Sequence, residues 1–486
     1  MNRHLAHVYV YSLLAAVPLI GICHAQSHSS LSTSWQAEAE SRLQAIYERG
    51  EFRSASFRAR WLPDSSAYTR EETDPETDSI VTARYGVRTG VRTVMKADEK
   101  AAATRDPLLS PDGTRILKFV DQNLFVRDIE SGERTQLTNC SIERDVRYIN
   151  PVWSPDGKRV AFVESDSTHV RERSLLVPKD PSYPGIQNHR FARVGEKIAT
   201  LRVGVVDSDG QNLIWLPIES PEEGFYLGQV DWAGNSEEVL IEKLSRFRDQ
   251  REFLIAKTNG DVRQLFRETN AAWAVSSQGK NSGLTWIRGG QAFVVVSEKD
   301  GWRHAFVWSR EGKELSLLTP GDYDIIDRAA IDEEGGWYYF YASPENATQK
   351  YLCRVALDGS GTLERITPTD QPGTHDYDFS PDAKWAFHTY STLDSPPVVE
   401  LIEVTDHRVV RVLEDNSQLR AKMKQLISHP TEFLQLDIGE GVTLDAWMIK
   451  PKEFDASKKY LRQPGTAFDR GAISRAQRIR SYAALC

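Results

Sequence analysis

The sequence predicts an all-β fold, a β-propeller, and three observations lead to it. Turn signals of the Ser-Pro-Asp-Gly type return along the chain. Short segments rich in Val, Ile, Phe and Tyr follow them, as expected for strands. The units recur about every four dozen residues, a blade period that a β-sandwich lacks. We favour eight blades, with seven as the alternative.

The turn signals have a stereochemical basis. Pro fixes φ at the first central position of a turn, Asp bonds back to the backbone, and Gly accepts the positive φ that other residues resist. Each copy therefore predicts a tight turn between two strands. The clear copies lie at 61–64, 109–113, 153–157 and 379–383, and degenerate copies lie at 231–235, 286–290 and 333–337.

Residues 1–25 have the features of a secretory signal peptide. Arg3 and His4 precede a mostly apolar run at 8–22, and Ala25 offers a small residue for cleavage before Gln26. A bilayer span needs about 20 apolar residues, more than this interrupted run provides. We therefore expect an exported protein, periplasmic or extracellular, with no membrane span after signal cleavage.

The segments around the repeats differ in character. Within 26–52, Ala-rich helical spacing predicts a short helix at Trp35–Ile46 that leads into the propeller at 53–430. A polar insertion at 165–199 contains three prolines, which we expect to break any regular element.

Another kind of domain begins after the propeller. A helical pattern at 413–426 precedes alternating segments at 433–438 and 442–450, which predict a hairpin. We assign 431–460 to the start of this second domain. The remainder, 461–486, is an Arg-rich tail without a hydrophobic period.

Composition limits the function. The chain is 40% hydrophobic and 10% aromatic, too much for a disordered protein, and its net charge of −9 argues against nucleic-acid binding. Removal of residues 1–25 leaves Cys140, Cys353 and Cys486, an odd and widely spaced set that predicts neither a disulfide framework nor a zinc site. We expect no metal and no cofactor, and the oligomeric state stays open.

Few side chains suggest chemistry. No G-x-S-x-G is present, so the nucleophile elbow of an α/β-hydrolase is missing and we assign no catalytic residue. The charged cluster Arg171, Glu172 and Arg173 lies in the insertion and is our candidate for substrate binding, because loops on a rigid scaffold often carry binding residues. We expect structural roles for His304 and His388 in strands, for His375 in a polar turn, and for Trp302, Trp337 and Trp385 between blades.

Several stretches together resemble the dipeptidyl peptidase IV branch of the prolyl oligopeptidase (S9) family of serine peptidases. They are the Trp-Ser-Pro-Asp-Gly turns and residues 194–197, 202–207, 300–304, 411–417 and 454–460, and the resemblance extends over Trp35–Tyr460. It implies an eight-bladed propeller that caps an α/β-hydrolase domain, cleavage of peptide substrates often after proline, and a catalytic Ser, Asp and His that all lie in the hydrolase part.

This sequence departs from the family at two places. Where the first core strand of the hydrolase should follow Tyr460, the sequence has Leu461–Gly465 and the Arg-rich tail, so none of the triad can be carried over. The resemblance also implies a pair of Glu residues that holds the substrate's amino group, on a short helix before a Trp-Ser-Pro-Asp-Gly turn. Residues 139–152 are too short for that helix and contain only Glu143. We interpret the pairs Glu222-Glu223 and Glu237-Glu238 as solvated turn charges.

We therefore expect the propeller region of an exported peptidase of this kind, inactive by itself because it lacks the catalytic domain. Two alternatives remain. The chain could be a secreted propeller that acts as a binding module, or a frameshifted fragment without a role, which the Arg-rich tail favours.

Overall fold

The computed structural model describes residues 32–75, 77–96, 108–140, 144–177, 182–274, 283–426, 431–451 and 453–459. These residues form two compact units. The first comprises residues up to Arg53 and contains α1 (Ser32–Leu43), which continues as a short π-helix, η1 (Gln44–Glu48). The expected helical lead-in is thus confirmed. Residues 1–25, where we expect a signal peptide, and the tail at 461–486 lie outside the described residues.

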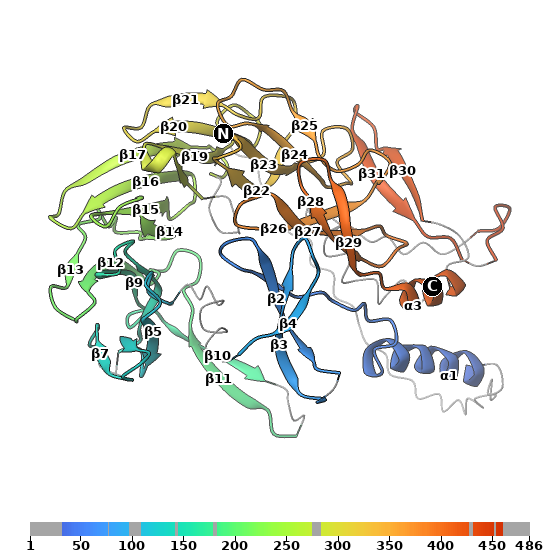
Figure 1. Cartoon of the computed structure of the whole chain (residues 1–486), viewed down its shortest axis with the longest axis horizontal. Helices are drawn as coiled ribbons and strands as arrows, with labels where there is room; N and C mark the ends of the chain where they lie inside the picture. Colours follow the sequence, from blue (N-terminus) through green and yellow to red (C-terminus); the bar gives the residue numbers. More distant parts are fainter. Residues whose placement is uncertain are drawn as a thin grey trace, which may run out of the picture. The chain divides into compact units, whose positions relative to one another are not determined.

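The second unit, from Ser54 on, contains seven antiparallel sheets that follow one another around a ring (Figure 1). The first four are β1–β4 (Arg60–Trp61, Ala67–Thr73, Ile80–Gly86, Arg92–Val94), β5–β7 (Arg115–Val120, Asn123–Asp128, Arg134–Gln136), β8, β9, β12 and β13 (Val146–Trp153, Arg159–Asp166, Thr200–Asp207, Ile214–Trp215) and β14–β17 (Phe225–Trp232, Glu238–Ser245, Gln250–Lys257, Val262–Thr269). The last three are β18–β21 (Thr285–Ile287, Ala292–Ser297, His304–Ser309, Glu314–Leu317), β22–β25 (Ile325–Asp332, Trp337–Ala342, Tyr351–Ala356, Glu364–Arg365) and β26–β29 (Thr374–Phe379, Trp385–Ser391, Val398–Glu403, Arg408–Glu414). The fold is a β-propeller. Among the described residues its blades number seven, the alternative to the favoured eight.

The predicted turns join the first and second strands of their sheets, except the turn at 109–113, which directly precedes β5. In the turn after β8, Ser154 Oγ donates to Asp156 Oδ1 (2.6 Å) and accepts from the backbone N–H of Arg159 (2.9 Å). These side chains satisfy backbone groups locally, and the backbone N–H of Asp156 also donates to Ser236 Oγ of the next sheet (3.1 Å). The same Ser–Asp bond is made by Ser110 with Asp112 and by Ser380 with Asp382. Hydrogen bonds from Ser110 and the backbone of Thr114 lower the pKa of Asp112 to about 2.

One turn departs from the pattern in its last residue. Gly113 and Gly157 have φ values of 74° and 68°, and Ala383 occupies the equivalent position with φ 53°. A side chain in this left-handed region is strained by about 1–2 kcal/mol relative to glycine. Ala383 is therefore a locally unfavourable residue in an otherwise regular turn.

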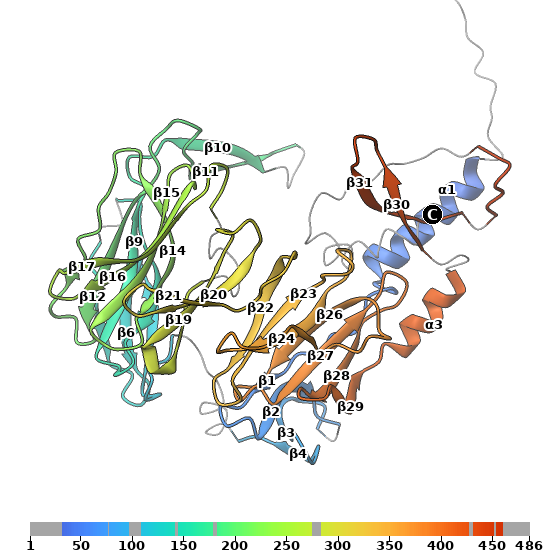
Figure 2. The same cartoon turned by 90° about the horizontal axis from the view of Figure 1, so that it is seen from above.

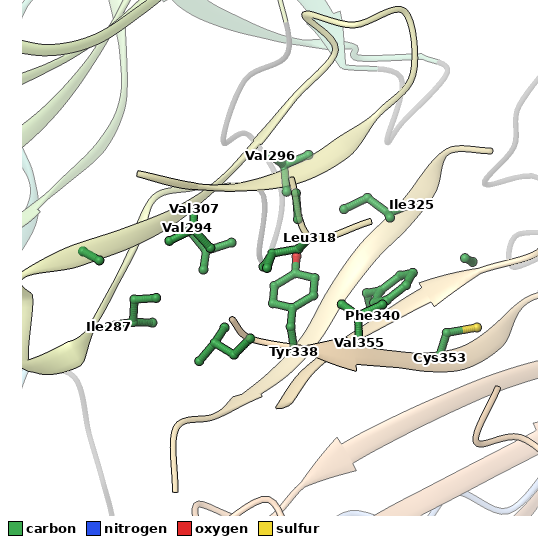
Figure 3. Packing of buried hydrophobic residues seen from close by; sticks show 14 of the residues in the cluster. Ile287, Val294, Val296, Val307, Leu318, Ile325, Tyr338, Phe340, Cys353 and Val355 are labelled. Carbon is green, nitrogen blue, oxygen red and sulfur yellow. The ribbon is translucent and has the colours of Figure 1, made fainter. Parts of the chain in front are cut away.

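Hydrophobic clusters join neighbouring sheets. Each of the six clusters contains buried residues from two sheets that follow one another around the ring. Figure 3 shows one of them, in which Val294 and Val307 of one sheet face Tyr338 and Phe340 of the next. Burial of each such side chain contributes about 1.5–3 kcal/mol, so these seams hold most of the folding energy.

The ring closes through the same kinds of contact that join its internal sheets. Phe387 in β27 stacks on Trp61 (ring centroids 4.2 Å apart) and packs edge-on against Tyr68 (5.0 Å) and Phe57 (5.1 Å). At three seams a Trp indole N–H donates to a backbone carbonyl of the preceding sheet: Trp153 to Leu108 (3.0 Å), Trp232 to Val152 (3.1 Å) and, across the closure, Trp61 to Asp378 (3.1 Å).

Asn416 adds a polar bond at the closure. Its side chain accepts from the backbone N–H of Ala55 (2.7 Å) and donates to the carbonyl oxygens of Ala55 (3.2 Å) and Pro397 (2.9 Å). The residue is buried and has φ 48°, a region that Asn tolerates better than most residues. The first residues of the propeller are thus bound to a residue two positions beyond its last strand.

Two segments outside the seven sheets test the sequence predictions. The insertion after β9 forms a hairpin, β10 (Glu172–Val177) and β11 (Gly185–Arg190), so our expectation of no regular element there was wrong. After the propeller, α3 (Ser417–Leu426) precedes the hairpin β30 (Glu432–Asp437) and β31 (Thr443–Met448), as predicted. Among the described residues, no helix is both long and apolar enough to cross a bilayer.

Candidate functional site

The topology separates two ends of the propeller. In an antiparallel sheet of four strands, the first and third turns lie at one end, and the second turn and the connection to the next sheet lie at the other. The Ser-Pro-Asp-Gly turns occupy the first end. The second end, here called the loop end, carries β10–β11 and the segments 216–224, 246–249, 298–303 and 366–373. Strand β29 also runs toward it and leads into α3 and β30–β31 (Figure 2).

The three candidate residues of the insertion do not converge. Arg171 precedes β10 and contacts Glu196 (Nη1–Oε1 3.0 Å), whose pKa is lowered by the Arg193 backbone N–H and by this guanidinium. Glu172 and Arg173 are consecutive in β10, so their side chains point to opposite faces of the hairpin. All three are exposed. They form an exposed, charged edge of this hairpin.

The Glu222-Glu223 pair is exposed in a turn. Both residues line a small cavity of about 160 Å³ at the loop end, together with His169, Lys197 and Phe225. Lys197 Nζ lies 3.7 Å from a carboxylate oxygen of Glu222, whose side chain is 89% exposed. The pair is therefore solvated, yet it borders a hollow that a small cation could enter.

The second pair is divided between two roles. Glu237 is exposed, but Glu238 is largely buried and accepts hydrogen bonds from Arg310 of the next sheet and from Asn235 (3.2 Å). Burial alone would raise the pKa of Glu238, and the Arg310 guanidinium outweighs it so that the pKa is lowered. The interpretation of Glu238 as a solvated turn charge was wrong, because it forms an ion pair across a seam.

A group of cationic and aromatic side chains at the loop end was not predicted. The guanidinium of Arg248 lies 4.7 Å from the centre of the Tyr226 ring and 5.4 Å from that of Trp273, and Arg246 lies 5.5 Å from Tyr226. Trp273 is 56% exposed and the adjacent Phe247 is 75% exposed. We call these five residues the Tyr226 cluster. Exposed Trp, Tyr and Arg are the residue types that dominate binding hot spots.

The histidines are more organised than their spacing suggests. His375, expected in a polar turn, lies in β26 and is fully buried, and it contacts the equally buried His388 in β27. His407 accepts or donates a hydrogen bond with Tyr377 Oη at 2.8 Å beside them. Burial, followed by the neighbouring His388, lowers the pKa of His375 to about 3 and that of His407 to about 4.

The remaining expectations for single residues are mixed. His304 is buried and bonds through Nδ1 to Asp300 (2.9 Å). Trp385 and Trp337 pack at seams as expected, whereas Trp302 is 38% exposed at the loop end, so its placement between blades was wrong. Glu143 lies outside the described residues. Within the described ranges, no group of three or more His, Cys, Asp or Glu side chains is arranged to hold a metal ion.

Comparison with known proteins assigns this propeller to a family. The profile of the dipeptidyl peptidase IV (DPP IV) N-terminal region matches residues 78–397, which is more than half of the chain. The chain belongs to this family. Dipeptidyl-aminopeptidase B of Aspergillus niger is 25% identical over 389 residues, a match that covers 72% of this chain and 43% of the relative. The chain thus spans less than half the length of that relative.

The DPP IV assignment agrees with the fold. The crystal structure of Porphyromonas gingivalis dipeptidyl peptidase 4 superposes with a TM-score of 0.75 at 21% identity, and the match covers 85% of this chain and 67% of that one. At this identity the likeness establishes the architecture alone. The DPP IV N-terminal region thus accounts for residues 78–397 of the propeller, and the chain continues beyond the propeller from its loop end.

Proposed function

We propose that the chain is the substrate-filtering propeller of an exported DPP IV-like serine peptidase that acts on peptides, often after proline. The observation that carries this proposal is the family match, together with the position of β30–β31 at the loop end. In such an arrangement the loop end faces the catalytic domain, and the Glu222-Glu223 hollow and the Tyr226 cluster border the space that a peptide would enter.

The exposed apolar face of the hairpin β30–β31 supports the proposal that a further domain packs at the loop end. In its register one face is almost wholly apolar, since Leu436 pairs with Leu444 and the neighbouring positions on that face are also hydrophobic. The apolar members of this face are Leu434, Leu436, Leu444, Ala446 and Met448 within the strands and Ile438 and Val442 just beyond them, and its one charged member is Glu432, opposite Met448. Five of them, Leu436, Ile438, Val442, Leu444 and Met448, are 40–60% exposed. An isolated hairpin is marginal in water, so we propose that the peptidase domain covers this face.

The chain by itself should not hydrolyse peptides. Acyl transfer needs a nucleophile, a base and an orienting acid within hydrogen-bond reach, and this sequence has no nucleophile elbow. The experiment is to purify the chain and assay dipeptidyl-proline substrates with and without a serine-directed phosphonate. We expect only background release. A rate that survives repurification and is abolished by the phosphonate would refute the proposal.

Selectivity for a free amino terminus should be weak in a longer protein that contains this propeller. A carboxylate pair recognises an ammonium group through charge-assisted hydrogen bonds, and the segment before Trp153 has no such pair. Cleavage of a free and an N-acetylated peptide should therefore differ little. If acetylation instead lowered the cleavage rate by several orders of magnitude, and the E222Q/E223Q variant cleaved the two peptides at equal rates, the Glu222-Glu223 pair would be the group that binds the substrate's amino terminus.

Export is part of the proposal. Fusion of residues 1–40 to a reporter that is active only outside the cytoplasm should give activity, and the same fusion without residues 1–25 should give none. Equal activity from both fusions would remove the basis for a periplasmic or extracellular location.

The Tyr226 cluster favours a second candidate function, peptide binding by the propeller alone. The exposed rings of Trp273 and Phe247 offer apolar surface for the proline ring of a peptide. The guanidinium of Arg248, which contacts Trp273, offers a cation for the peptide's carboxylate. Titration of the chain with proline-containing peptides should show saturable binding that W273A weakens. Trp302 is also exposed at the loop end, so W302A is the matched control. Equal binding by both variants would reject the cluster as a site.

A further inference from the structure

A chain of hydrogen bonds runs through the last sheet from a backbone carbonyl to a carboxylate. The carbonyl oxygen of Gln371 lies 3.0 Å from His375 Nε2, and His375 Nδ1 lies 2.8 Å from His388 Nε2. His388 Nδ1 in turn lies 3.2 Å from Glu400 Oε2. The two imidazole planes are parallel within 2° and the ring centroids are 5.1 Å apart. With the two nitrogens 2.8 Å apart, that separation places the rings end to end and not one above the other, as a hydrogen bond between ring nitrogens requires. We call this series the His375–Glu400 chain.

Two neutral imidazole rings do not supply enough N–H donors for the three contacts of this series. Both ends of the chain, a carbonyl and an ionised carboxylate, can only accept, so three contacts require three N–H donors. A neutral imidazole carries one N–H, and two neutral rings supply two. In one of the three contacts, two acceptor atoms would then face each other without a proton between them. This contact would be buried, since His375 and His388 are both 0% exposed. An unmade buried hydrogen bond costs about 1–3 kcal/mol.

We propose that the folded protein holds one extra proton on the His375–Glu400 chain, shared between His388 and Glu400, and that unfolding above neutral pH releases it. Either an imidazolium beside a carboxylate or a neutral imidazole beside a carboxylic acid satisfies all three contacts. In support, the pKa of His375 is lowered to about 3 by burial and by His388, so that His375 stays neutral and the proton lies on the other side.

Groups from two sheets surround this chain. Tyr341 Oη accepts from the backbone N–H of Tyr377 (2.8 Å) and joins the sheet β22–β25 to β26–β29 at this place. The proton therefore lies at a seam, and its loss should loosen that seam. The titratable and charged groups around the two histidines are His407, Asp406, Glu400, Asp370, Asp376, Lys350, Arg365, Cys353, Tyr341, Tyr351, Tyr377 and Tyr390.

The charge at Glu400 gives a direct test. In E400Q the amide can donate the third hydrogen bond to His388 Nδ1, so both rings are satisfied when neutral and no extra proton is needed. Between pH 8 and 9 the unfolded histidines and carboxylates hold almost no such proton. The unfolding constant of the wild-type chain should therefore rise about tenfold more per pH unit than that of E400Q, in urea titrations of the full chain.

Glu403 on the same strand provides the control, because it pairs with Arg408 at the surface. E403Q should keep the wild-type pH dependence. Identical slopes for wild type and E400Q would overturn the proposal. Nitrogen NMR of the wild-type histidines at pH 8 is an independent measurement that does not need the variant to fold. Two protonated ring nitrogens on His388, or a neutral His388 whose Nδ1 carries no proton because it accepts from a carboxylic acid at Glu400, would support the proposal. A neutral His388 with its proton on Nδ1, donated to an ionised Glu400, would overturn it.

Discussion

Truncation of Phe387 to alanine should open the propeller at its closure. Phe387 is 5% exposed and contacts Trp61, Tyr68 and Phe57, which precede it by more than 300 positions. A buried Phe→Ala change costs about 3–5 kcal/mol, and each aromatic pair adds about 0.5–1.5 kcal/mol beyond its buried area. Three lost pairs place the expected loss of stability at the upper end of that range, about 5 kcal/mol.

Hydrogen exchange measured by mass spectrometry distinguishes a local opening from general destabilisation. In F387A the amides of β1–β4 and β26–β29 should exchange faster than those of β14–β17. The matched control is F293A, which removes the same side chain from an internal seam where Phe293 is fully buried. Uniformly faster exchange in both variants would show that the closure is no more separable than any other seam, and the reasoning would fail.

Four further changes have expected outcomes. In G228A the new Cβ would lie 2.0 Å from a Glu242 carboxylate oxygen, so the melting temperature should fall by several degrees. The control is G185A, whose new Cβ meets no atom within 4 Å and should leave the melting temperature unchanged. A383G relieves a left-handed alanine and should stabilise the chain by about 0.5–1 kcal/mol in urea titrations; destabilisation would contradict the strain at φ 53°. The pKa of His407 is about 4 in the folded protein and near 6.5 when unfolded, so the unfolded state binds more protons between these values and stability should fall as pH falls from 6.5 to 4. H407Q should reduce the slope of this part of the curve without removing it, because His375, whose pKa is also lowered, contributes the rest; an unchanged slope would contradict the assignment. Limited proteolysis should cut β30–β31 before the propeller, because its apolar face is exposed, and equal resistance would mean that the hairpin is already covered.

The elements that the sequence predicts correctly depend on neighbours along the chain. The turn at Ser154–Gly157 is made by its own side chains, and the strands beside it alternate or run apolar over a few residues. The hairpin at 433–450 was also predicted, because its two strands are separated by only a short Gly-containing turn. Local chemistry thus specified most of the blades.

The features that the sequence does not predict depend on register and on contacts between sheets. His375 and His388 are 13 positions apart and meet only because β26 and β27 pair in one register. Glu238 looks like a turn charge until the next sheet brings Arg310 to it. The prolines of the insertion suggested an irregular loop, yet Val177 and Gly185 pair as the last residues of a regular hairpin.

The bonds of Asn416 have a mechanical consequence. Because Ala55 and Asn416 hold one another, the chain leaves the ring at the point where it enters. Any domain attached after α3 is thereby tethered directly to the closing seam, and tension on that tether acts first on the seam and not on the five sheets opposite. Movement of the attached domain and opening of the ring at this seam are then coupled, and the hydrogen bonds of Asn416 are the contact that couples them.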